Sequence, residues 1–170
     1  MWRAFALAVA AVACAVPARA QTSAADAEYR PTLLFGARYG APTGLTGDLG
    51  LLIPVVKPER GDDLGDTYAH KGVALVASAG EGGQRIAAGA AWLAKPEGGP
   101  VLFAVDVLGN VTRTSSAPRV ATGDSTYVGV EAGYTVLMVR VSAGVARRTA
   151  GPTGPGGTIF TWSVGFHTGW

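Results

Sequence analysis

The chain has 170 residues, of which 48% are hydrophobic and only 15% charged, and it carries one cysteine and a formal net charge of +2. Two of the fourteen basic residues, Arg3 and Arg19, and the cysteine, Cys14, lie in the first twenty residues, so residues 21–170 hold equal numbers of acidic and basic side chains. A neutral, cysteine-free chain of this length predicts one domain and excludes a disulfide scaffold, a thiol nucleophile and a thiolate metal site. It also argues against nucleic-acid binding, which needs clustered positive charge.

Residues 1–20 have the pattern of a secretory signal peptide. A short basic start ending at Arg3 precedes an apolar stretch at residues 4–16, and Ala18-Arg19-Ala20 forms a small-x-small cleavage site. The pattern predicts export with cleavage after Ala20, which leaves residues 21–31 as a short polar leader and residues 32–170 as the folded domain. Lipidation of Cys14 is the alternative, but a bulky aliphatic residue is usual where Ala11 stands.

Beyond residue 20 the sequence alternates with a period of two, which indicates strands with two different faces. No apolar run there approaches the roughly 20 residues of a membrane-spanning helix. The alternation predicts eight strands, at residues 32–41, 45–53, 72–80, 84–94, 101–112, 127–134, 137–148 and 158–170. A long polar stretch, residues 55–71, separates the second strand from the third.

The last predicted strand has the most contrasting faces. Large apolar residues alternate with small or polar ones. The large residues are Phe160, Trp162, Val164 and Phe166, and Trp170 ends the chain. In a soluble sandwich this face would be the core, whereas in a transmembrane barrel it would meet lipid. Further aromatic residues on the same parity near strand ends fit an interfacial girdle, namely Tyr39, Trp92 and Tyr134.

Eight strands of about 9 to 11 residues have the length that crosses a bilayer at a steep tilt. Closing them into a ring removes the unpaired edges that lipid does not tolerate. The fold class predicted is therefore all-β, a closed eight-stranded antiparallel up-and-down transmembrane β-barrel.

At this level the sequence resembles the small eight-stranded outer-membrane barrels of the OmpA/OmpX type, and the resemblance covers residues 32–170 as architecture. It implies the bacterial outer membrane as location, with its lipid and lipopolysaccharide as surroundings. It also implies that the barrel-assembly machinery reads the final strand from Phe160 to Trp170. One feature departs from that family. Its periplasmic turns are usually short, yet a periplasmic C-terminus makes residues 55–71 a long periplasmic segment and leaves a very short external turn near Pro42.

The inward parity of the predicted strands holds a nearly balanced set of charges. These residues are Arg38, Asp48, Arg85, Asp106, Glu131 and Arg140, accompanied by His167. Because side chains fill the lumen of an eight-stranded barrel, the set predicts paired charges that close the interior, and no open pore. A proton path, a gate or a ligand site is the functional alternative.

Two other classes of function stay open. A lipid A-modifying barrel enzyme, an acyl hydrolase or transferase, needs a nucleophile beside a histidine base. The two histidines, His70 and His167, have no serine two or three residues away on the same face, so we expect no enzyme, no cofactor and no metal site. A soluble periplasmic barrel that binds an apolar ligand would turn Phe160 and Trp162 inward. The preferred hypothesis is a structural or surface-interaction role through loops at residues 115–124 and 150–157.

Overall fold

The computed structural model describes residues 31–56, 59–61, 67–96, 99–115, 118, 120–153 and 157–169. The predicted signal peptide, the leader up to residue 30 and Trp170 lie outside these residues. The described part of the chain contains no helix long and apolar enough to cross a membrane.

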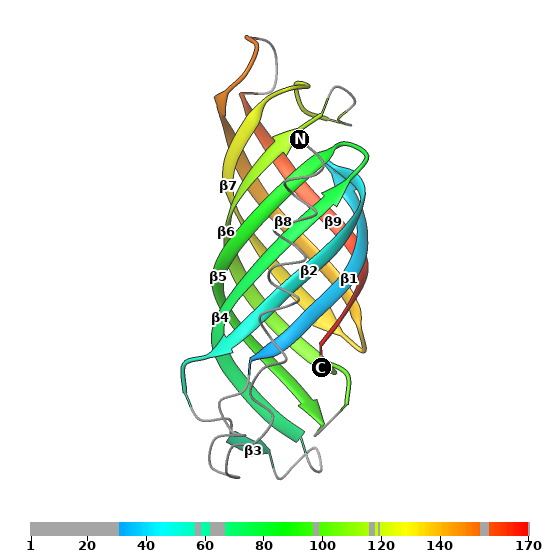
Figure 1. Ribbon diagram of the computed structural model, residues 1–170, viewed down its shortest axis with the longest axis vertical. Helices are drawn as coiled ribbons and strands as arrows, with labels where there is room; N and C mark the ends of the chain where they lie inside the picture. The colour runs from blue at the N-terminus through cyan, green and yellow to red at the C-terminus, as the bar shows by residue number, and fades with distance from the viewer. Residues whose placement is uncertain are drawn as a thin grey trace, which may run out of the picture.

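The described residues form nine strands in one antiparallel sheet. Their bounds are β1 Thr32–Ala41, β2 Gly44–Pro54, β3 Glu59–Gly61, β4 Thr67–Gly80, β5 Gly83–Pro96, β6 Phe103–Thr114, β7 Thr126–Val136, β8 Val139–Ala150 and β9 Thr158–Gly169. Each barrel strand pairs with its neighbours in the order β2-β1-β9-β8-β7-β6-β5-β4, and a β2–β4 pairing closes the ring. The predicted closed eight-stranded antiparallel up-and-down barrel is confirmed (Figure 1).

The two ends of the barrel differ in their connections. β1 begins and β9 ends at the same end, called the terminal end here, where Leu34 pairs with Gly169. The connection between β2 and β4, with the short strand β3 against β4, lies at this end, at the bottom of Figure 1. At the opposite, distal end, the β1–β2 turn spans only residues 42–43. The unusual loop lengths expected from the sequence are therefore present.

The observed strands differ from the sequence-based prediction in three places. The polar stretch at residues 55–71 contains β3 and the first five residues of β4, because residues 59–61 pair with residues 67–69. β6 begins at Phe103, two residues later than predicted. β8 begins at Val139, because Leu137 and Met138 form the turn after β7, with φ of 46° and 72°.

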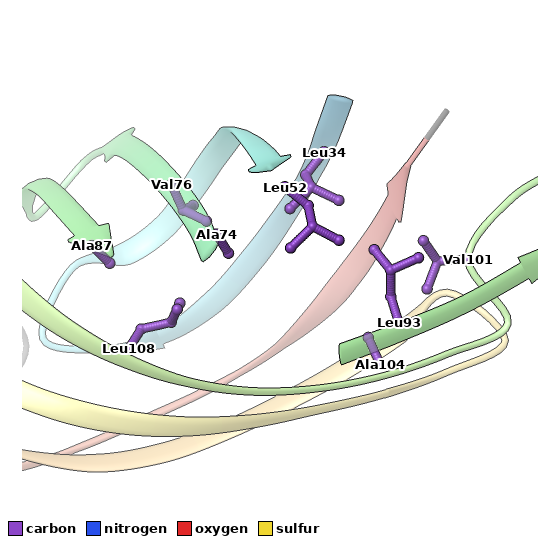
Figure 2. Packing of buried hydrophobic residues seen from close by; sticks show 9 residues of the cluster. All are labelled: Leu34, Leu52, Ala74, Val76, Ala87, Leu93, Val101, Ala104 and Leu108. Carbon is purple, nitrogen blue, oxygen red and sulfur yellow. The ribbon is translucent and has the colours of Figure 1, made fainter. Parts of the chain in front are cut away.

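The outer and inner faces of the barrel have opposite chemistry, as the parity predicts. Every barrel strand exposes large apolar side chains outward, from Phe35 on β1 to Phe166 on β9. Inside, buried apolar residues form a cluster at the terminal end, shown in Figure 2. We call it the apolar cluster; its members are Leu34, Leu52, Ala74, Val76, Ala87, Leu93, Val101, Ala104 and Leu108. The sequence predicted paired charges inside the barrel and did not predict this apolar part of the lumen.

Candidate functional site

The charged residues predicted to point inward all lie inside the barrel and contact one another. The set comprises Arg38 on β1, Asp48 on β2, Arg85 on β5, Asp106 on β6, Glu131 on β7 and Arg140 on β8. Their side chains are only 5% to 8% exposed. We call these six residues the charge network.

Glu131 is the centre of the charge network. Its Oε1 atom lies 3.6 Å from Nη1 of Arg38 and 3.5 Å from Nη2 of Arg140, and it also contacts Nη2 of Arg85. One carboxylate therefore joins arginines from three strands. Burying a charge is expensive unless it is paired, so each of these contacts offsets part of the desolvation penalty.

The other two carboxylates each hold one arginine. Asp48 accepts from Nε of Arg38 at 3.2 Å. Arg140 donates from both Nη atoms to the two carboxylate oxygens of Asp106, with 2.8 Å between Nη2 and Oδ1. This two-pronged contact is the strongest geometry available to an arginine and a carboxylate. Three arginines and three carboxylates give the network a formal charge of zero.

Glycines on neighbouring strands make room for these long side chains. Gly133 stands opposite Asp106, and a methyl group there would overlap the guanidinium of Arg140. Gly144 stands opposite Glu131, and a methyl group there would lie 2.8 Å from Cβ of Glu131. The cross-strand register thus pairs large inward residues with residues that have no side chain.

The charge network separates two small cavities. One, of about 30 Å³, is lined by the apolar cluster and His167, and the other, of about 20 Å³, by hydroxyl and amide groups such as Asn110 and Thr161. Arg38 and Arg85 line both. Cavities of this size hold about one to three waters each, since one water needs about 10–15 Å³. Asp48 Oδ1 and Arg85 Nε have no hydrogen-bond partner among the described residues, so water in these cavities would satisfy them.

The distal mouth is covered from inside by residues 121–122, in the connection between β6 and β7. Tyr127 is completely buried, and its hydroxyl accepts from the backbone N–H of Thr122 at 3.0 Å. Arg148 donates to Oγ1 of Thr122 at 2.9 Å, and Ala121 packs against Tyr127, Ala146 and Ile159. This cover was not predicted from the sequence. Its one signal in the sequence is Tyr127, a large aromatic residue on the inward parity of β7.

The two histidines lie far apart in the sheet. His167 on β9 is buried, lines the larger cavity and makes no side-chain hydrogen bond with the described residues. His70 lies on β4, opposite Leu93. The inward serines are engaged elsewhere: Ser78 accepts from Arg38 at 3.0 Å, and Ser142 bonds to Ser163 at 2.7 Å. Within the described residues, no three histidine, cysteine or carboxylate side chains group together as metal ligands do.

The aromatic residues of the last strand lie on the outer face. Phe160, Trp162 and Phe166 are 61%, 43% and 48% exposed, and Val164 lies between them on the same face. Tyr39 on β1 meets Trp162 edge to face, with 6.2 Å between ring centroids. Their predicted role as an assembly signal stays a prediction.

No protein-family model, no curated protein and no solved structure matches this chain. The resemblance to small outer-membrane barrels therefore extends as far as the closed eight-stranded architecture.

Proposed function

We propose that the chain is a bacterial outer-membrane protein, a small barrel of the OmpA/OmpX type with a structural or surface-interaction role and no open pore. The observation that carries the proposal is the outer face. It exposes large apolar side chains on all eight barrel strands, while the charge network lies inside. A soluble protein rarely exposes an apolar patch larger than a few hundred Å². A continuous apolar belt is the surface that lipid covers.

The height of this belt supports the same proposal. On β6, the outward residues from Phe103 to Val111 are uncharged, and Arg113 follows. Nine residues span about 27 Å along a strand, or about 21 Å along the axis at a tilt near 40°. Outer-membrane barrels have an apolar band about 25 Å tall. With the C-terminus in the periplasm, as the resemblance implies, the distal end faces outside.

Fractionation and heating test the location. We expect the protein in the outer-membrane pellet, with a gel mobility that changes when the sample is boiled. A closed barrel resists detergent until heated, whereas an unfolded chain does not. Recovery in the soluble periplasm without a heat-dependent shift would contradict the proposal and favour the soluble ligand-binding barrel.

A matched pair of arginine substitutions tests the belt directly. Val107→Arg puts a charge in the middle of the belt, which costs about 2–4 kcal/mol near the bilayer midplane. Thr149→Arg adds the same charge at an exposed position near the distal rim. We expect the first variant to lose most of its heat-modifiable form and the second to keep it. Equal levels would show that the belt does not face lipid.

The closed interior supports a role without conduction. Six side chains and a covered distal mouth lie across the lumen, and the two cavities hold a few waters at most. We expect no stable conductance steps in planar bilayers that contain the purified barrel. Regular open-channel steps from the native protein would contradict this part of the proposal.

The barrel-assembly machinery is the proposed partner during insertion. The outward aromatic residues of β9 support it, because they form the apolar terminal strand that this machinery reads in the resembling family. Deleting Trp170 should lower the amount of heat-modifiable barrel while export continues. Normal barrel levels in the deletion variant would remove Trp170 from the proposed signal.

A further inference from the structure

The outer face carries two exposed arginines at its distal end. Arg113 is the residue before the last of β6, and Arg147 lies three residues before the end of β8. Both occupy the outward parity, which is otherwise apolar across the belt. Lys71, at the terminal end of β4, is a further exposed cation on this parity. No acidic residue lies on the outward parity of the described barrel strands.

The two arginines flank the same strand, β7. Arg113 pairs with Thr126, and Arg147 stands opposite Val128. Two strand spacings, about 10 Å, separate β6 from β8. An arginine side chain is long enough to lean across its neighbouring strand, so the two guanidinium groups can both reach the outer face of β7 at its distal end.

Polar groups surround the two arginines. Gln84 on β5 pairs with Arg113, and Thr158 on β9 pairs with Arg147. A register shift next to Thr126 leaves Thr149 as an extra residue in β8, and Thr149 and Thr158 are exposed. Directly below, Val111, Val128 and Val145 continue the apolar belt. The surface therefore changes from apolar to cationic within one or two residues along β6 and β8.

Neither arginine has a charged partner in the described part of the chain. Two acidic residues, Glu81 and Asp124, lie in the distal turns, and neither forms an ion pair with Arg113 or Arg147. The charges inside the barrel are balanced, so these exposed guanidinium groups remain available to an external anion. Arginine pairs with phosphate through two parallel N–H donors.

We propose that Arg113 and Arg147 bind the phosphate groups of an anionic glycolipid in the external leaflet. Its acyl chains would lie on the apolar belt formed by β6, β7 and β8, on the terminal side of the two arginines. The inference rests on the proposed function, because it needs the distal end to lie at a membrane surface. The two arginines recognise a phosphate group, and the apolar surface beside them favours a phosphate that is carried by a lipid. A free phosphate ion would gain only the exposed charge contacts.

Lipid binding by the purified full barrel tests the proposal. The folded protein in neutral detergent is titrated with diphosphorylated lipid A, and bound lipid is counted by native mass spectrometry. A basic residue near a charged membrane surface contributes about fivefold in affinity. We therefore expect Arg113→Gln with Arg147→Gln to weaken binding by about thirtyfold, and the corresponding lysine variants to keep part of it.

The control removes the same charge at the other end of the barrel. Lys71→Gln with Lys95→Gln should leave lipid A binding within about twofold of the native value. Dephosphorylated lipid A should bind the native protein as weakly as diphosphorylated lipid A binds the double glutamine variant. Inorganic phosphate at millimolar concentration should not displace the lipid, and complete displacement would overturn the lipid as the ligand.

Two failures are distinguishable. If the native protein is heat-modifiable and fractionates with the outer membrane, but both double glutamine variants bind lipid A equally, the site is wrong while the proposed function stands. If the protein is recovered as a soluble barrel, the proposed function is wrong, and the lipid site falls with it.

Discussion

The apolar cluster and the charge network fill neighbouring parts of the same lumen and are held together in different ways. In the apolar cluster, each buried side chain contributes roughly in proportion to the surface it removes from water. In the charge network, Glu131 holds three arginines at once, so one lost carboxylate affects residues on β1, β5 and β8. The stability lost on removing a side chain should therefore scale with its size in the apolar cluster. In the charge network, removing one carboxylate should weaken contacts on several strands at once.

Removing the central carboxylate should have the largest effect. Glu131→Leu leaves three buried arginines with two carboxylates, and an unpaired buried charge costs about 3–5 kcal/mol. We expect the free energy of unfolding of the barrel in micelles, measured with urea, to fall by that amount. Glu81→Leu changes an exposed turn residue and should shift it by about 0.5 kcal/mol or less.

A charge-balanced pair of substitutions separates charge balance from packing. Asp106→Leu alone leaves Arg140 without its two-pronged partner, whereas Asp106→Leu with Arg140→Met removes one charge of each sign. The double variant should be more stable than the single one, because replacing a whole buried pair by apolar groups is often nearly neutral. A double variant that is less stable than Asp106→Leu would show that packing dominates the network.

The next largest effect belongs to the apolar cluster. Leu52 is completely buried, and Leu52→Ala should lower the free energy of unfolding by about 3 kcal/mol through lost contacts and a cavity. Leu45, on the outer face of the same strand, is 54% exposed and serves as the control. Equal losses from Leu52→Ala and Leu45→Ala would mean that the interior is no better packed than the surface.

A smaller loss is expected where the network depends on a glycine. Gly133→Ala brings a methyl group against the guanidinium of Arg140 and should cost about 2 kcal/mol by overpacking. In an Asp106→Leu, Arg140→Met background this loss should shrink, because the obstructing guanidinium is gone. Gly47→Ala is the control, since nothing lies within 4 Å of the added carbon.

The smallest effect concerns the turn between β7 and β8. Leu137 and Met138 have positive φ, as a two-residue turn of the mirror-image kind requires, and such turns favour Asn-Gly. Leu137→Asn with Met138→Gly should raise the free energy of unfolding by about 1 kcal/mol. Both interior regions keep their contacts in this variant, so Glu131→Leu and Leu52→Ala should lose the same amounts in its background.

Period-two alternation predicted most of the barrel because the two faces differ in chemistry. Residues 32–41 were predicted with the bounds of β1, and the parity that placed Arg38 and Glu131 inward is the parity of the structure. A strand that is apolar outside and polar inside leaves this pattern in a single sequence, whichever strands it pairs with.

Other features of the structure depend on which strands pair, and the sequence of one strand does not contain this information. Contacts such as Arg85 with Glu131 depend on which strands are neighbours and on their register. The apolar cluster was missed because Leu34 and Leu52 share a parity with charged residues, and their meeting depends on the β1–β2 pairing. β3 was missed because three residues are too few for a period to show. The turn at Leu137 carries no glycine or asparagine to mark it.

The pairing of β1 with β9 also sets the order of events in folding. Residues 34–41, near the start of the domain, find their partners in residues 162–169, at its end. The edge of β1 that pairs with β9 therefore stays open until the last strand arrives, and closure of the barrel waits for this most distant contact. A chain cut short before β9 would keep that edge of β1 unpaired, and strands of other chains could pair with it. Its fate would be aggregation or degradation, and no stable seven-stranded remnant should accumulate.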